Sequence, residues 1–254
     1  MIPRDPFLQT ESAVAMPTLK LLYSDRVPID EKISVVIPTV GQILDNEESY
    51  YSMVSMLTAM PIDYMVLLDD MGLDFSVMTE YELFLHLFPY IQTLNKDDAK
   101  LIFGDLDLTK FLLAQSDSGS LAFVDVENDI VIDKRVHSKI ASLLRMVHGI
   151  KKDVRKPANK DAKEYMLETA RRRLRRRSRV KESSQIESLI TAMVNSSEFK
   201  YNFESVRNLT IYQFNESVKQ VIKRVDYDNR MYGVYTGTIK VKDMGKDDLN
   251  WLVH

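Results

Sequence analysis

The stretch KRVHSKIASLLRMVHG, residues 134–149, has the clearest helical pattern in the sequence. Its apolar residues recur at intervals of three and four, so they fall on one face of a helix. These residues are Val136, Ile140, Leu143, Leu144 and Val147. Asp133 precedes the stretch as an N-cap, and Gly149 ends it as a left-handed C-cap. The stretch predicts an amphipathic helix on a hydrophobic core.

Helical patterns continue on the N-terminal side of this stretch. A first run begins at Glu47 and ends at Pro61, and a second starts at Pro61 and stops at Gly72. Thr79 and Glu82 have the spacing of a capping box, in which a hydroxyl and a carboxylate satisfy free backbone donors at a helix start. We therefore expect three helices between residues 47 and 90.

The C-terminal third also has a helical pattern. Ser184 with Glu187, and Thr210 with Gln213, each have the spacing of a capping box before an apolar run. The aromatic residues after the second run form no amphipathic pattern. We expect an ordered packing or interface strand, in which Trp251 either anchors the C-terminus on the body or contacts a partner; the aromatic residues are Tyr227, Tyr232, Tyr235 and Trp251.

The apolar period changes between residues 102 and 133. SLAFVDVENDIVID, residues 120–133, predicts two short strands around a turn at Asn128 and Asp129. DLTKFLLA, residues 107–114, is a third candidate strand. The predicted fold class is therefore mainly α with a small antiparallel β insertion (α+β).

Composition changes divide the chain into four predicted regions. Residues 1–42 mix prolines with short β-branched runs, which indicates an extended, peripheral arm or a short strand, and no helix. Residues 43–150 form an acidic helical domain with a β-hairpin near 120–133. Residues 151–181 form a basic linker and an arginine-rich helix, and residues 182–254 form a helical region with an aromatic tail.

Charge is distributed unevenly along the chain. Residues 1–150 hold 11 Lys and Arg against 23 Asp and Glu, whereas residues 151–181 hold 14 against 4. The N-terminal part should therefore have a negative field and the segment after it a positive one.

RRRLRRRSRV, residues 171–180, contains seven arginines. A helix from about Lys160 to Lys181 would have an apolar stripe in its first half only, so the second half is cationic on nearly all sides. Three interpretations remain open: a solvated helix face, docking on carboxylates of this chain or of a partner, and nucleic-acid binding. The candidate partner-binding residues are Arg171, Arg172, Arg175, Arg176 and Arg179, together with Tyr235 and Trp251.

Catalytic and metal-binding motifs are scarce. The sequence has no cysteine, no phosphate-binding glycine loop and no HExxH. Glu82 and His86 share a helix face, which is more often a local contact than a metal site. The aspartates that could hold magnesium are explained more simply as caps and turns; they are Asp69, Asp70, Asp74, Asp105 and Asp107. We expect a non-enzymatic protein without catalytic, cofactor-binding or metal-binding residues.

Three segments carry a resemblance to a known group of proteins. They are IPTVGQILDNEESYYSMVSMLTAMPIDYMVLLDDMGLDFSVMTEYELF (residues 37–84), NLTIYQFNESVKQVIKRVDYDNRMYGVYTGT (208–238) and DLNWL (248–252). Together they resemble proteins encoded among the tail genes of tailed bacteriophages and prophages of Gram-positive bacteria. They are also distantly similar to baseplate-hub assembly proteins of contractile-tailed phages. The resemblance spans roughly residues 35–252 and includes no catalytic motif.

This resemblance implies a tail or baseplate assembly or structural protein that acts through protein–protein interactions. Its expected partners are other phage tail or baseplate proteins. The alternative is a nucleic-acid-binding accessory protein that uses residues 171–181. Because the sequence shows neither a signal peptide nor a membrane span, we expect it in the host cytoplasm during assembly, with the virion tail as a second location.

Overall fold

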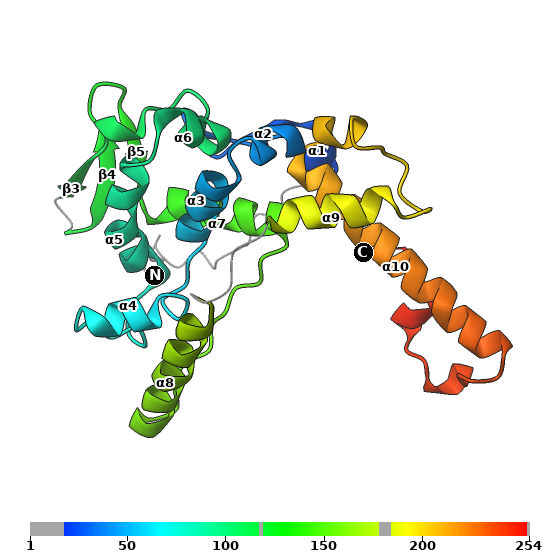
Figure 1. Cartoon of the computed structure of the whole chain (residues 1–254). Coiled ribbons are helices and arrows are strands. Elements are labelled where there is room, and N and C mark those ends of the chain that lie inside the picture. Colours follow the sequence, from blue (N-terminus) through cyan, green and yellow to red (C-terminus); the bar gives the residue numbers. More distant parts are fainter. Residues whose placement is uncertain (1–17, 117–118, 178–183, 253–254) are drawn as a thin grey trace, which may run out of the picture.

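The computed structural model describes residues 18–116, 119–177 and 184–252 (Figure 1). The α-helices are α1 (Thr18–Tyr23), α2 (Val40–Leu44), α3 (Glu47–Leu57), α4 (Met65–Asp70), α5 (Glu80–Gln92), α6 (Lys96–Phe103), α7 (Lys134–His148), α8 (Lys160–Arg177), α9 (Gln185–Val194) and α10 (Ile211–Tyr235). The strands are β1 (Arg26–Pro28), β2 (Ser34–Val36), β3 (Leu112–Gln115), β4 (Leu121–Asp125) and β5 (Ile130–Ile132). The fold is mainly α with a small antiparallel β part, as predicted.

Helix α7 occupies the centre of the body, in contact with α3, α5, α10 and β5. The Asp133 side chain accepts a hydrogen bond from the Val136 amide, and Gly149 closes the helix at φ 64°. The five apolar residues expected on one face are all buried. The prediction for residues 134–149 is confirmed, because both caps and the apolar face agree with one helix.

The β insertion has the predicted three strands in the order β3-β4-β5. Leu113 pairs with Phe123, and Phe123 pairs with Ile132. The turn between β4 and β5 includes Asp129 at φ 52°, a left-handed conformation that Asp tolerates better than most residues. Phe123 and Ile132 are buried, so one face of this sheet packs on the body.

The expectation of an extended, peripheral N-terminal arm is wrong for residues 18–42. This segment contains α1 and α2 as well as the antiparallel pair of β1 and β2. Its alternate apolar residues are buried in the core; they are Val27, Ile29, Ile33, Val35 and Ile37. Burial of every second side chain stabilises these short strands, although prolines lie at or near their ends. Residues 1–17 of the predicted arm lie outside the described residues.

Buried side chains form two hydrophobic clusters. The larger runs from Leu21 to Val218, so the predicted N-terminal, acidic and C-terminal regions share one core. The smaller consists of Ala59, Ile62, Leu68, Phe75, Leu83, Leu87 and Leu167. Helix α5 contributes side chains to both clusters and thereby connects them.

A buried arginine of α7 lies where the two clusters meet. One terminal nitrogen of Arg145 donates to the Thr58 carbonyl at 2.6 Å and to Glu80 Oε1 at 2.7 Å. Lys152 Nζ lies 2.6 Å from the other oxygen of Glu80. Burial alone would raise the pKa of Glu80, but the hydrogen bonds from Lys152 and Arg145 outweigh it and lower the pKa. The group therefore ties α7 to the end of α3 and the start of α5.

Replacing Arg145 with Leu should lower the free energy of unfolding by about 3 kcal/mol, because it leaves the Thr58 carbonyl unpaired and Glu80 with one cation fewer. The matched control is Arg135→Leu on the exposed side of the same helix, for which we expect a change within about 0.5 kcal/mol. Urea denaturation at neutral pH measures both. Equal stability of the two variants would contradict a bridging role for Arg145.

Candidate functional site

Helix α8 is anchored to the body by one stripe of its first half. Lys163, Leu167 and Arg171 follow one another at intervals of four and so lie on one face. Lys163 Nζ is 2.8 Å from Asp74 and 5.6 Å from the centre of the Phe75 ring. Leu167 is buried in the smaller cluster. The stripe thus combines a charged, an apolar and a second charged contact.

Arg171 lies one turn beyond Leu167 on this stripe. Its guanidinium lies 2.8 Å from Asp69 and 2.6 Å from Asp70, at the end of α4. Carboxylates of the acidic region therefore bind one of the predicted partner-binding arginines within the chain. Leu174, which follows on the same side, is 53% exposed, so packing against the body ends at Arg171.

The anchoring contacts shift the pKa of Asp74 and of Arg171. Hydrogen bonds from Lys163 and from Ser76 lower the pKa of Asp74 to about 2. The hydrogen bonds with Asp69 and Asp70 raise the pKa of Arg171. All these side chains remain accessible to solvent, so water and salt screen each pair. Leu167 therefore supplies the part of the anchor that salt does not weaken.

Beyond Arg171 the helix carries an exposed group of arginines, which we call the cationic tip. It consists of Arg172, Arg173, Arg175 and Arg176. Arg172 lies 3.3 Å from Glu168 on the same helix. In Figure 1 this end of α8 projects away from the body. Arg179, also predicted to bind a partner, lies outside the described residues.

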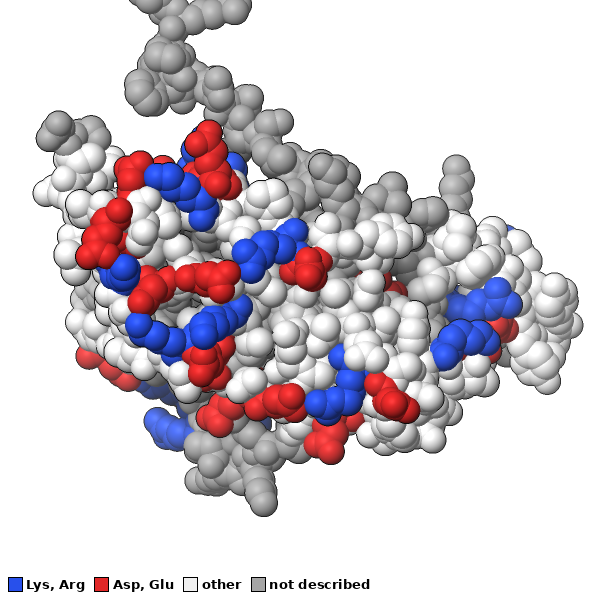
Figure 2. Space-filling model, turned by 90° about the horizontal axis from the view of Figure 1, so that it is seen from above, with Lys and Arg blue, Asp and Glu red and all other residues white. Residues whose placement is uncertain are grey.

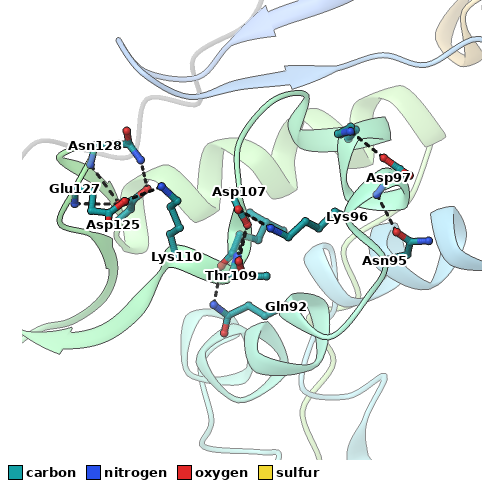
Figure 3. Close-up of polar contacts among 12 residues, drawn as sticks. Gln92, Asn95, Lys96, Asp97, Asp107, Thr109, Lys110, Asp125, Glu127 and Asn128 are labelled. Carbon is teal, nitrogen blue, oxygen red and sulfur yellow. Dashed lines mark hydrogen bonds and ion pairs between the residues drawn. The ribbon is translucent and has the colours of Figure 1, made fainter.

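The acidic residues considered for magnesium binding form ion pairs and caps. Lys96 and Thr109 donate hydrogen bonds to Asp107 and lower its pKa to about 2 (Figure 3). Asp105 lies 3.9 Å from Arg26. A pocket of about 160 Å³ adjoins these two aspartates and Lys96. Within the described ranges, no group of three or more His, Asp or Glu side chains could hold a metal ion.

The acidic region does not present an unbroken negative surface. Figure 2 shows acidic side chains interleaved with basic ones on the face seen from above. The ion pairs of this region include Asp45 with Arg207, Asp97 with Lys100 and Asp107 with Lys96. Arg207 comes from outside residues 1–150, as do Lys163 and Arg171, so basic residues of the rest of the chain neutralise part of the excess negative charge of that region.

Helix α10 forms a second projection and corrects the expectation of an interface strand. The Thr210 capping box is present, and the helix continues to Tyr235, so Tyr227, Tyr232 and Tyr235 are helical. Its first turns are buried through Ile211, Phe214 and Val218. Beyond these turns the helix extends away from the body (Figure 1).

The residues that follow α10 fold back along it. Gln220 donates to the Trp251 carbonyl at 2.8 Å, and the Arg224 guanidinium lies 5.1 Å from the centre of the Trp251 ring. Arg230 forms an ion pair with Asp248. The absence of a side chain at Gly233 leaves room for Ile239, whose Cδ1 lies 2.7 Å from where a Cβ would be. We call residues 236–252 the returning tail.

The structure separates the predicted partner-binding residues into two groups. Arg171, Arg172, Arg175 and Arg176 are on α8, whereas Tyr235 and Trp251 are on the projection formed by α10 and the returning tail. Tyr235 is 84% exposed, which suits a contact residue. Trp251 is 41% exposed and packs against Arg224, so it anchors the tail and still presents part of its ring.

Sequence reasoning missed Lys163 as an anchor because a lysine on a charged helix is usually solvated. The signal that could have found this anchor was charge complementarity: Lys163 and Arg171 are basic, and the aspartates at residues 69–74 are acidic.

In the part of the chain that the structure describes, no helix is long and apolar enough to cross a membrane.

Replacing Gly233 with Leu should release the returning tail, because the new side chain would occupy the space of Ile239. The helix itself should persist, since Leu favours a helix by nearly 1 kcal/mol over Gly. We expect faster tryptic cleavage after Lys240 and Lys242, and a red shift in the emission of Trp251, the only tryptophan. The control is Asn229→Leu, one turn earlier on the exposed surface. Unchanged cleavage and emission in Gly233→Leu would contradict this packing.

Comparison with known proteins gives one match. Residues 179–254 match a family described as the YomV second domain. This is a phage-derived protein family of the kind found in a Bacillus prophage like SPBeta. No curated protein and no solved structure matches the chain. The matched range includes α9, α10 and the returning tail, so this part of the chain is similar to a phage-derived domain.

Proposed function

We propose that this chain is a phage protein that assists assembly of the tail or baseplate by binding other proteins, without catalysing a reaction. The match of its C-terminal part to a phage-derived family supports a phage origin. The resemblance of residues 37–84 and 208–252 to tail-gene products supports the tail or baseplate. On this proposal the chain acts in the host cytoplasm during assembly.

The observation that carries the proposal is the cationic tip of α8. The anchoring stripe ends at Arg171, so the arginines after it extend from the body on a helix that is already formed. A preformed helix lowers the ordering cost of binding. Guanidinium groups pair with carboxylates through two parallel hydrogen bonds, so an acidic protein surface is a suitable partner.

The contacts of Arg171 favour a partner that offers carboxylates over one that offers phosphates. Its contacts with Asp69 and Asp70 show how the arginine run engages an acidic helix end. A partner with a similar acidic helix end could bind the arginines that follow Arg171 on α8 in the same way. The charge of the partner would also accelerate association, which would weaken at high salt.

Nucleic-acid binding is the second candidate, because exposed arginines cover several sides of the tip. Each phosphate contact would release counterions and give a steep salt dependence. Single-stranded nucleic acid is usually bound with aromatic side chains as well, and the tip contains none. This absence favours the protein partner.

The test is binding of the full-length protein to the products of neighbouring tail genes and to random duplex DNA, at low and physiological salt. Replacing Arg172, Arg175, Arg176 and Arg179 with Gln should weaken association with the tail protein at least about tenfold, a loss of about 1.4 kcal/mol. The monomer should remain folded, since exposed ion pairs contribute little to stability.

The matched control removes four positive charges elsewhere, by changing Lys134, Arg135, Lys156 and Lys200 to Gln; all four are exposed. This variant should bind the tail protein as the wild type does. Tight DNA binding that only the tip variant loses, beside unchanged partner binding, would replace the proposal with the nucleic-acid function.

A further inference from the structure

Strand β3 forms an open edge of the three-stranded sheet. Its one neighbour among the described strands is β4, and it is the outermost strand of the sheet in Figure 1. All four of its residues are exposed, and Leu112 is 68% exposed. The strand LLAQ contains no charged residue and no proline, the features that usually prevent an edge strand from pairing.

The ladder with β4 determines which backbone groups of β3 point outward. The Ser116 amide donates to the Ser120 carbonyl at 2.8 Å, next to the pair of Gln115 and Leu121. Backbone groups in an antiparallel ladder alternate between the two sides of a strand. The amides and carbonyls of Leu113 and Gln115 therefore point away from β4, towards the open edge.

The outer face of the sheet is also apolar. Leu112 pairs with Val124, and Val124 pairs with Val131, which gives a row of aliphatic side chains across all three strands. Ala114 and Ala122 form a second row on the same face. Outer faces of antiparallel sheets usually carry polar residues. An apolar outer face beside an open edge indicates a protein-contact surface.

Side chains of the body hold the start of β3 in place. Gln92 donates to the carbonyls of Leu108 and Phe111 at 2.7 and 2.9 Å, and Lys110 forms a 2.6 Å ion pair with Glu127 (Figure 3). The strand is therefore preformed, and a second strand could add to it without first ordering it.

We propose that β3 pairs antiparallel with β3 of a second copy, so that the two sheets form one continuous six-stranded sheet. A two-fold axis at Ala114 places Leu113 opposite Gln115 of the second copy, which matches the outward donors and acceptors of both strands. The pairing brings no like charges together, because β3 is uncharged and Lys110 is neutralised by Glu127. The aliphatic rows then continue across the axis.

The size of this contact determines its strength. A stable interface buries roughly 1,200–2,000 Å² with 20–30 residues on each side, whereas β3 offers four residues. The dimer should therefore be weak and reversible. A weak dimer forms to a larger extent when other interactions hold copies of the chain close together. Its formation does not depend on the cationic tip.

Sedimentation velocity of the full-length protein from about 1 to 500 μM tests the proposal. The wild type should shift reversibly from monomer to dimer. Ala114→Lys places two ammonium groups directly opposite each other at the axis and should weaken the dimer at least about tenfold. Ala114→Glu should do the same. Both variants should fold, because Ala114 is exposed.

An equimolar mixture of Ala114→Lys and Ala114→Glu should restore the dimer, since opposite charges then meet at the axis. The control Val154→Lys adds the same charge at another exposed apolar position and should dimerise as the wild type does. A wild type that stays monomeric over the whole range would overturn the proposal. So would an Ala114→Lys dimer of unchanged strength, or a mixture that fails to associate.

Discussion

The contact of Arg145 with Glu80 and Thr58 is the constraint on which the arrangement of the body depends. Arg145 belongs to the central helix, Glu80 begins α5 and Thr58 follows α3, so one guanidinium fixes three segments. Their side chains are little exposed, 10% for Arg145 and 16% for Glu80, so the charges are largely desolvated. The Nε of Arg145 is buried without a hydrogen-bond partner among the described residues. The free-energy cost of burying these charges and the unpaired Nε is offset because Lys152 also pairs with Glu80 and the surrounding apolar side chains pack closely.

The position of α8 follows from this constraint. Thr58 and Glu80 enclose the segment that contains α4 and Phe75, and this segment provides the carboxylates and the apolar surface for the anchoring stripe. The first half of α8 is therefore as fixed as the smaller cluster, whereas the second half has no core to pack on. The cationic tip, the α10 projection and the β3 edge are three separate surfaces of one core. Three exposed surfaces on one core are consistent with the proposed role of binding several proteins.

The sequence predicted the features that depend on local chemistry. The caps at Thr79, Asp133 and Thr210 and the apolar face of α7 follow directly from residue type and spacing. Features that depend on tertiary contacts were missed. The alternation of apolar residues from Val27 to Ile37 was visible, but prolines suggested a peripheral arm, and only packing on the core shows that these strands are buried. The role of Arg145 was not predicted, because a buried charge cannot be recognised before its partners are placed. Gly233 acquires its role only when the returning tail lies against it.

Amide hydrogen exchange along α8 of the free protein tests the account most directly, because the account requires an anchored first half and an uncovered cationic tip. Amides of residues 164–170 should exchange slowly, as those of the body do, because Leu167 is buried and Lys163 and Arg171 are paired. Amides of residues 173–177 should exchange quickly, since local opening at an exposed helix end has little free-energy cost. Equal, strong protection along the whole helix in the free protein would show that the arginines are already covered, and would contradict a surface available to partners.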